Sequence, residues 1–460
     1  MTKKGNRLRT QIASRTIVPI VSALALLYLA TLTADYYWDG ITFALQIEKV
    51  AKMERGPSLL FHQNHLLYNA LGYLPYYLIH ASGLHLRALY LLQVGNALAG
   101  AIAVAVFFRM TEKVTRSRYA ALVSSAALAF SSVWWKLATD ANAYTLSMLL
   151  LLICAYVLLS ERPQWTVVGL LLASAMLVHQ LASLFYVAAL VAVFTNPTIQ
   201  KRWEFAVKFS ATAWGVTAAA YTICASLLYS VNKPFEVVKW AVSNPSGVLP
   251  ARNPLSGLKE LPLGNLDMIV GHNMVVYRSE GGWIAKLLAL GTLITAACFV
   301  IKLLREAKLV LLLRSFSNVS LQTREISRKV GPMFITWIGV YLAFLLFWEP
   351  WQVLYGAFYL PPLFLMLGIA LSSYHNVSRR LPGGASAYAV ATFALFNLTF
   401  YIAPNMRVTA NPLVAAASNT SHLWNPQTVI YFADRNEADT TFEYFNDQTE
   451  MAEVQVSNAD

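Results

Sequence analysis

Charged residues are scarce in this sequence. Asp, Glu, Lys and Arg make up 13% of its 460 residues, whereas hydrophobic residues make up 57%, and the mean hydropathy is +0.50. Soluble globular chains carry about 25% charged residues. A soluble protein of this length could not cover so much apolar surface, so the composition excludes cytosolic and secreted globular classes.

Cysteines and phosphate-binding glycine loops are scarce or absent as well. Cys154, Cys224 and Cys298 lie in apolar runs at unrelated spacings, which excludes a disulfide framework and a zinc site. No glycine-rich loop has a phosphate-binding pattern. The net charge of +12 would suggest a nucleic acid partner in a soluble protein. Basic residues, however, accumulate in the cytoplasmic loops of membrane proteins, so we expect no nucleic acid partner.

Long apolar runs are the main feature that is present. A membrane-spanning helix needs about 20 mostly apolar residues. Hydropathy and turn residues predict eleven such spans, at 17–34, 86–108, 119–132, 143–160, 165–178, 181–195, 206–230, 283–303, 332–348, 353–373 and 385–404. The first span follows a basic N-terminal stretch, and we expect it to be uncleaved because the apolar run continues to Ala34. The sequence thus predicts an all-α polytopic membrane protein.

The distribution of basic residues fixes the predicted orientation. The segment 165–194 suits neither one ordinary span nor two full ones, and we divide it into two short spans at His179-Gln180. With that break, the predicted inner segments hold 22 of the 35 Lys and Arg residues, as expected for cytoplasmic loops. The N-terminus is then inside, and the C-terminus is outside.

Three predicted outer segments are long enough to have structure of their own. The first, 35–85, contains the stretch HLLYNALGYLPYYLIH, which is typical of an interfacial helix. The second, 231–282, is rich in Pro, Gly and Asn, and we expect an ordered lid or loop region. The third, 405–460, has eight acidic and two basic residues and short aromatic β-like runs. It is either a small extracytoplasmic module or a solvated tail, attached to a transmembrane domain at 1–404.

Two carboxylates follow the first span, Asp35 and Asp39, with aromatic residues between them. Partial desolvation at a membrane boundary raises the proton affinity of a carboxylate, so it can act as a general base. We favour Asp39 as the base because it precedes Gly40, where the backbone can turn toward a substrate. The alternative is a solvated span end within an aromatic belt.

Further polar residues gather at the outer ends of other spans, where ionisable groups often mark a site. The first outer segment has His62, Asn64, His65 and Tyr68, which are candidates for substrate binding or for capping a helix. Two histidines three residues apart could hold a metal ion, but no third ligand is near in the sequence. Three later clusters supply the remaining candidate substrate-binding residues, Asp140, Tyr144, His179, Gln180, Glu349 and Tyr355.

Each of these clusters also has a purely structural interpretation. Asp140 is equally consistent with a helix-start residue favoured by the helix dipole. A lone histidine such as His179 is more often a satisfied polar residue between helices, and Glu349 lies between tryptophans typical of a membrane boundary. All of the clusters nevertheless fall on the outer face of a topology derived from other residues. That convergence favours one extracytoplasmic site.

Several stretches resemble the C-type glycosyltransferase superfamily, which uses polyprenyl-phosphate sugars, and within it the branch of protein O-mannosyltransferases and aminoarabinose transferases. The resemblance rests on the acids after the first span, on RALYLLQVGN at 87–96 and FSSVWWKLATDANAY at 130–144, on the break at His179, and on FYLPP at 358–362. It covers roughly the first 200 residues and, more weakly, 347–362. The chain departs from the branch at 62–65, where it has HQNH instead of His-Pro-Pro, and at Asn142-Ala143, where Glu-Val is usual.

The resemblance implies an enzyme that moves a sugar from a polyprenyl-phosphate donor to the hydroxyl of a glycan, lipid or protein, with inversion at the anomeric carbon. Cations near the outer surface would bind the donor phosphate, and the candidates are Lys136, Arg87 and Arg278. No cofactor is expected to be obligatory, although a divalent cation is compatible. The expected location is the bacterial inner membrane, with the active site on the extracytoplasmic face.

Two other classes remain open at this point. A transporter or flippase for a lipid-linked sugar would also have charged groups at membrane depth, but near mid-span and toward both faces. A non-catalytic envelope-assembly protein would need no convergence of polar groups at all. The gathering of unusual polar residues at the outer span ends favours the glycosyltransferase.

Overall fold

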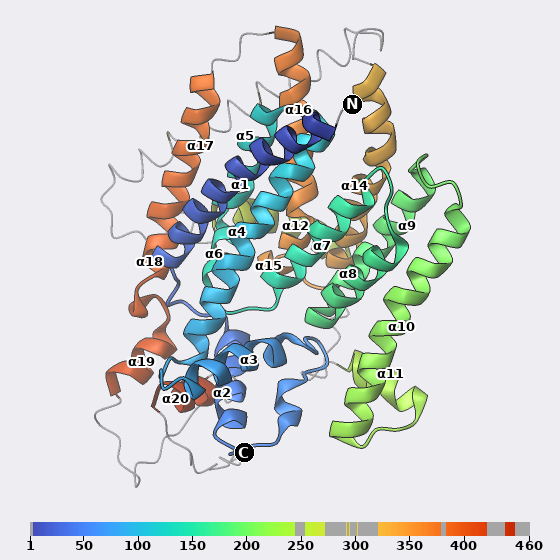
Figure 1. Ribbon diagram of the computed structural model, residues 1–460. Helices are drawn as coiled ribbons and strands as arrows, with labels where there is room; N and C mark the ends of the chain where they lie inside the picture. Colours follow the sequence, from blue (N-terminus) through green and yellow to red (C-terminus); the bar gives the residue numbers. More distant parts are fainter. Residues whose placement is uncertain are drawn as a thin grey trace.

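A computed structural model describes residues 3–243, 254–271, 321–378, 383–420 and 438–446, with the single positions 291, 294 and 301. Within these residues the chain is helical, and its β-structure is limited to an isolated bridge between His62 and His65. Long helices lie side by side in a bundle, and shorter helices gather at one end of it (Figure 1). The predicted all-α class is confirmed.

The long helices form the bundle. They are α1 (Lys3–Ala30), α4 (Ala88–Thr115), α5 (Arg118–Phe130), α7 (Tyr144–Leu158), α8 (Trp165–Val178), α9 (Phe185–Thr195), α10 (Arg202–Tyr229), α14 (Leu321–Phe347), α16 (Leu360–Ser378) and α17 (Gly383–Asn397). Close packing uses small residues, because a side chain at Gly100 of α4 would meet the Cβ atom of Ala138 at 2.7 Å. Such small-residue contacts let helices approach closely in a membrane.

The helices have the composition of a multi-pass membrane protein. Among the described residues, four stretches are long and apolar enough to cross a membrane. α5 and α6 (Ser132–Thr139) pass the same test together, with a bend of 64° between them, as a broken span or a re-entrant loop. Shorter apolar stretches lie in α1, α7, α8, α9 and α14. The count of eleven spans stays a prediction, and the predicted span 283–303 lies outside the described residues apart from isolated positions.

Contacts between helix termini divide the helix ends into two groups. At one end, Ser372 Oγ donates to the Thr115 carbonyl at the end of α4 (3.0 Å), and the α1 helix begins there. At the other end, Ala34 N donates to the Asn405 carbonyl (2.7 Å), and the Tyr229 hydroxyl donates to the Phe61 carbonyl (2.9 Å). We call this second end the loop end. It carries all the shorter helices of the first predicted outer segment.

The chain reverses at His179, as the sequence predicted. His179 has an extended backbone (φ −154°, ψ 121°), and its Nδ1 accepts the Leu181 N–H at the start of η2 (Gln180–Leu184). Its ring lies 4.4 Å from that of Tyr144 at the start of α7, whereas Asn196, after α9, donates to the Leu158 carbonyl at the end of α7 (3.3 Å). α8 and α9 therefore run in opposite directions.

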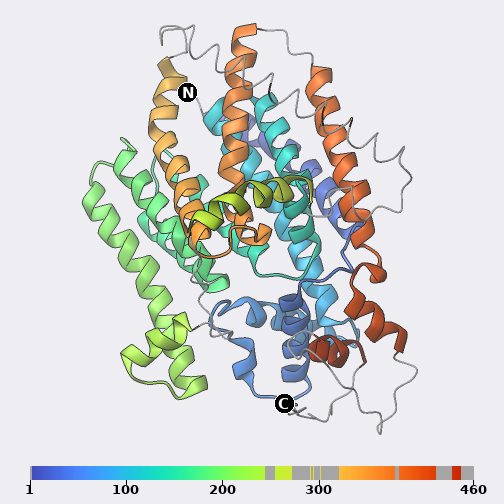
Figure 2. The same ribbon diagram turned by 180° about the vertical axis from the view of Figure 1, so that it is seen from behind.

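The predicted outer segments contain helices. The first has α2 (Trp38–Ala51), η1 (Pro57–Leu60) and α3 (Tyr68–Ala81), and α3 exposes an apolar stripe that includes Leu71, Leu74 and Leu78. The second has α11 (Pro234–Val242) and α12 (Pro254–Val270), and α12 lies across the bundle helices (Figure 2). The remaining loop-end turns are α15 (Val353–Gly356), η3 (Ala357–Tyr359), η4 (Leu398–Ile402), α18 (Ala403–Asn405) and η5 (Val408–Ala410).

The C-terminal region corrects one expectation. Its described residues form α19 (Pro412–Thr420) and α20 (Ala438–Asn446), so the stretch ADTTFEYFN is a helix and not a β-like run. The helical hydrophobic face explains the difference, because Phe442 and Tyr444 are buried against the rest of the loop end. The residues 421–437 and 447–460 lie outside the described part, and the domain division at 404 stays a prediction.

Candidate functional site

The segment that links α1 to α2 is fixed by its main chain. Ala34 N and Asp35 N both donate to the Asn405 carbonyl, at 2.7 and 3.1 Å, and Thr33 Oγ1 donates to the same carbonyl at 3.1 Å. Gln93 of α4 donates to the Thr33 and Thr139 carbonyls (2.8 and 2.9 Å). Segment 33–35 is thus held by residues that are up to 372 positions away in the sequence.

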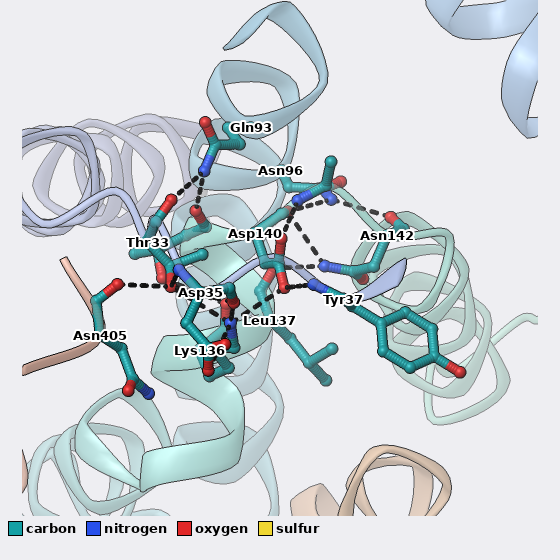
Figure 3. Close-up of polar contacts among 12 residues, drawn as sticks. Thr33, Asp35, Tyr37, Gln93, Asn96, Lys136, Leu137, Asp140, Asn142 and Asn405 are labelled. Carbon is teal, nitrogen blue, oxygen red and sulfur yellow. Dashed lines mark hydrogen bonds and ion pairs between the residues drawn. The ribbon is translucent and has the colours of Figure 1, made fainter. Parts of the chain in front are cut away.

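Lys136 lies at the centre of this region (Figure 3). Its ammonium lies 3.2 Å from an Asp140 carboxylate oxygen and 3.8 Å from an Asp35 carboxylate oxygen. It also donates to Thr33 Oγ1 (3.1 Å) and to the Asp35 carbonyl. The side chain of Lys136 is only 11% exposed. This cation is engaged by protein oxygens, and its predicted contact with a phosphate stays a prediction.

The Asp140 carboxylate is engaged in the same way. Besides Lys136, it accepts the N–H of Tyr37 at 3.0 Å and the N–H of Ala141 at 2.8 Å, and its side chain is 2% exposed. Asn96 of α4 donates to the Asp140 and Asn142 carbonyls, both at 2.8 Å. Asp140 therefore joins α6 to the start of α2, which is a positioning role. Its predicted contact with substrate is untested.

Asp39 lies in the first turn of α2, close to this junction. The next residue, Gly40, packs so tightly that a Cβ atom on it would lie 2.3 Å from the Ala141 carbonyl oxygen. Gly40 is helical, so its role is close packing and not the turn that the sequence suggested. The tight contact fixes the position of Asp39 relative to residues 140–143.

A cluster of aromatic and imidazole rings surrounds the start of α7. Tyr144 lies 4.4 Å from His179, 6.1 Å from Tyr355 and 6.2 Å from Tyr37, measured between ring centroids. The His65 ring lies 4.5 Å from His179 and 5.9 Å from His62. Phe43 lies 5.2 Å from Tyr68 and 5.3 Å from His65. Five predicted substrate-binding rings from four separate segments therefore meet here, namely His62, His65, Tyr144, His179 and Tyr355.

The electrostatics of the loop residues connects Asp39 and Glu349 to this cluster. Burial raises the pKa of Tyr37 well above its usual range, and the nearby Asp39, Tyr355 and Glu349 raise it further. Burial lowers the pKa of His62, and burial together with its histidine neighbours lowers that of His65 well below 6.5. The lowered pKa values favour the neutral form of both imidazoles.

Gln180 and Asn64 join the first outer segment to α10 and α11. The Gln180 amide donates to the Gln63 carbonyl (3.0 Å), the Tyr221 hydroxyl (3.0 Å) and the Ala241 carbonyl (2.6 Å), and Gln180 N donates to the Asn64 carbonyl (3.1 Å). These bonds occupy the Gln180 amide with protein partners. The predicted substrate contacts of Gln180 and Asn64 are untested.

The other predicted phosphate-binding residues lie apart from this cluster or outside the described residues. Arg87 donates to the buried Glu48 (3.1 Å) and to the Tyr444 carbonyl of α20 (2.5 Å), and its guanidinium lies 4.1 Å from the Tyr444 ring centroid. Arg278 lies outside the described residues. In the described part of the chain, no group of three or more His, Cys, Asp or Glu side chains is arranged to hold a metal ion.

The comparisons with solved structures show which fold this helical bundle shares. The crystal structure of ArnT from Cupriavidus metallidurans bound to undecaprenyl phosphate superposes with a TM-score of 0.53 at 13% sequence identity, covering 94% of this chain and 84% of ArnT. ArnT is an aminoarabinose transferase with the GT-C fold. The predicted resemblance to this fold is confirmed.

The other comparisons are weaker. The apo state of the same ArnT gives a TM-score of 0.43 at 12% identity, covering 95% of this chain and 85% of ArnT. Neither a protein-family model nor a curated protein sequence matches the chain. The shared feature is therefore the fold.

Sequence reasoning did not single out the residues that hold the site together. Tyr37, Gln93, Asn96 and Asn405 make its main hydrogen bonds or ring contacts. A signal was available for two of them, because Gln93 and Asn96 are amides one helical turn apart in an otherwise apolar span. Polar side chains inside membrane helices usually bond across helices.

Proposed function

We propose that this protein is a membrane glycosyltransferase that moves a sugar from a polyprenyl-phosphate donor to an acceptor hydroxyl. The observation that carries the proposal is the ring cluster at the loop end of a GT-C fold, where Tyr144 lies 6.2 Å from Tyr37 and 6.1 Å from Tyr355 and where the charge of Asp39 raises the pKa of Tyr37. The undecaprenyl phosphate bound to the structural neighbour ArnT supports a lipid phosphate as the donor class. The acceptor is a glycan, a lipid or a protein.

The chemistry needs one base. The acceptor oxygen attacks the anomeric carbon as its proton passes to Asp39, and the bond from that carbon to the phosphate oxygen breaks. The electron pair leaves with the polyprenyl phosphate, which is already an anion, so a general acid is not required. Direct displacement inverts the anomeric configuration. We assign the base to Asp39 because it lies in the first turn of α2 and its charge reaches Tyr37 and Tyr144 of the ring cluster.

The remaining predicted residues divide into two groups under this proposal. His62, His65, Tyr68, Tyr144, His179, Glu349 and Tyr355 form the wall around the reacting groups. Asp140, Gln180 and Asn64 hold that wall in place through their bonds to other segments.

The donor phosphate needs a cation. Lys136 is one candidate, because the phosphate could replace its distant partner, the Asp35 carboxylate at 3.8 Å. Arg87 and Arg278 remain the other candidates.

We place the reaction on the extracytoplasmic face of a bacterial inner membrane. The loop end carries the predicted outer segments, and the opposite end carries Arg116 and Arg162, which belong to predicted inner segments. Basic residues mark the cytoplasmic side. A polyprenyl-phosphate donor needs no nucleotide, which suits a site outside the cytoplasm.

The test uses the purified full chain in lipid nanodiscs. Undecaprenyl phosphate is titrated first, and saturable binding is expected at the level of one lipid per protein. Transfer is then measured with undecaprenyl-phosphate sugars and a panel of envelope glycans, lipids and peptides, with mass analysis of the products. Absence of lipid binding, or equal binding of undecaprenol and undecaprenyl phosphate, would overturn the proposal.

A further inference from the structure

The C-terminal helix α20 packs on the helix that carries Asp39. Glu48, in the last turns of α2, is 4% exposed, and one of its carboxylate oxygens accepts three hydrogen bonds. These come from Arg87 Nε (3.1 Å), Ala88 N (2.8 Å) and the Tyr444 hydroxyl of α20 (3.1 Å). A buried carboxylate is costly unless it is paired and hydrogen-bonded. The ordering of α2 therefore depends on a partner that lies 396 residues later in the chain.

The Tyr444 hydroxyl is both a hydrogen-bond donor and a hydrogen-bond acceptor. It donates to Glu48 and accepts the Leu89 N–H of α4 at 3.1 Å. The residue is 2% exposed, and Arg87 covers its ring at 4.1 Å. Burial and the neighbouring Glu48 raise the pKa of Tyr444, so the hydroxyl keeps the proton that it donates. Tyr444 thus links α2, α4 and α20 through one oxygen atom.

Two contacts beside Tyr444 extend the link in both directions along the first outer segment. Glu443 pairs with Lys49, the neighbour of Glu48. Phe445 lies 6.0 Å from the ring of Tyr36, which is one residue from Tyr37 and three from Asp39. α20 therefore contacts α2 near its C-terminal end and the segment just before its first turn. A helix held near both ends has little freedom to shift.

We propose that α20 is a positioning element for the proposed base, with Tyr444 and Glu48 as the positioning residues. This inference rests on the proposed function in one respect, namely that Asp39 must be held in register with a substrate. The reacting groups of an enzyme have to be held within fractions of an ångström, and a displacement of about 1 Å can cost a hundredfold in rate. The C-terminal region is then part of the active unit and not an independent appendage.

The experiment compares four forms of the full chain in nanodiscs: wild type, Tyr444→Phe, Glu48→Gln and the control Asp439→Asn. Asp439 lies on α20 and is exposed, and its carboxylate accepts hydrogen bonds from the neighbouring Thr440. Its change should therefore have no effect. Amide hydrogen exchange is read over 438–446 and over the first turn of α2 at 38–42. Loss of one buried hydrogen bond should raise exchange roughly five- to tenfold in both segments.

Activity gives the second readout. Tyr444→Phe and Glu48→Gln should each lower kcat by about tenfold or more with little change in the donor KM. The double variant should cost no more than the worse single variant, because both changes remove the same link. Faster exchange in 438–446 alone, with normal exchange at 38–42 and a normal kcat, would overturn the proposal.

A charge exchange keeps the test valid if Tyr444→Phe fails to fold. Lys49→Glu and Glu443→Lys should each accelerate exchange at 38–42, and the double variant should restore both the exchange rate and kcat. Failure of the double variant to restore either one would contradict the proposal. If the wild type transfers no sugar, the proposed function fails separately, while the exchange data still decide whether α20 holds α2.

Discussion

The Lys136 ammonium and the Asp140 carboxylate form a buried ion pair, 3.2 Å apart, that joins α6 to the segment entering α2. Lys136 also lies 3.8 Å from the Asp35 carboxylate, so one cation balances two acids. The pair thus gives Asp35 and Asp140 a structural role in holding this segment.

Removing one member of this pair should destabilise the protein. Lys136→Met leaves Asp140 buried without its cation, and breaking a buried pair typically costs about 3–5 kcal/mol. We expect a loss in the free energy of unfolding of roughly 3 kcal/mol, measured by denaturant titration in detergent. The double variant with Asp140→Asn should cost less than the sum of the two single changes. Additive losses would contradict a direct coupling.

Asp39→Asn should abolish most activity while Asp35→Asn should not. Asp39→Asn keeps the shape and removes the proposed base, which typically costs 10²–10⁴-fold in rate, or roughly 3–5 kcal/mol of barrier. Asp35 makes its closest bonds through its main chain, to Asn405 and Lys136, so its carboxylate is less critical. Turnover of the two purified variants decides between them. A dead Asp35→Asn with an active Asp39→Asn would exchange their roles.

Gly40→Ala should be harmful and Gly95→Ala harmless. A Cβ atom at Gly40 would lie 2.3 Å from the Ala141 carbonyl oxygen, so the first turn of α2 would have to move. Overpacking of this kind costs about 1–3 kcal/mol, and the displaced Asp39 should lose activity. A Cβ atom at Gly95 of α4 would meet no neighbouring segment within 4 Å, and alanine there should be neutral or stabilise by about 0.5–1 kcal/mol. Equal effects in melting and turnover assays would refute the packing argument.

Stability should fall as the solution becomes acidic. Burial lowers the pKa of His179 to about 3 and that of His65 well below 6.5. Between pH 6.5 and the lower folded pKa, the unfolded chain binds protons that the folded chain excludes. Each histidine then removes about 1.4 kcal/mol of stability per pH unit as the pH falls. His179→Asn keeps an acceptor for the Leu181 N–H. It should reduce the slope of stability against pH by the contribution of one histidine, about 1.4 kcal/mol per pH unit. An unchanged profile would show that His179 does not titrate in this way.

The membrane topology can be tested by labelling. Gln200→Cys and Asp439→Cys, each in a cysteine-free background, are exposed in intact cells to a maleimide that does not cross membranes. Residue 200 precedes α10 at the end opposite the loop end, and α20 lies at the loop end. We expect labelling of residue 439 and not of residue 200. The reverse pattern would place the candidate site in the cytoplasm.

Much of the helical framework could be predicted from the sequence. Apolar runs locate the spans because a bilayer imposes a minimum apolar length. The reversal at His179 could be inferred only because loop charge constrains direction, since hydropathy alone does not divide 165–194. Ring residues such as Tyr144, His179 and Tyr355 could be grouped because alternating spans bring every second connection to the same face.

The partners of the polar residues could not be predicted. The bond from Ala34 to Asn405 and that from Tyr444 to Glu48 each join residues more than 350 positions apart. No local pattern encodes such a pairing, because it depends on how the whole bundle packs. For the same reason α20 resembled aromatic strands in the sequence: Phe442 and Tyr444 are buried by contacts that only the assembled loop end provides.

The bond between Ala34 and Asn405 also has a consequence for biosynthesis. The segment that carries Asp35 leaves the ribosome well before its partner Asn405, which follows α17 in the chain. During translation, therefore, the two parts of the candidate site exist only in succession. A nascent or truncated chain that stops before Asn405 would insert most of its helices into the membrane yet lack an ordered Asp39. Partly synthesised chains should accordingly be unable to consume the proposed donor, and catalytic competence should begin only after Asn405 has been translated.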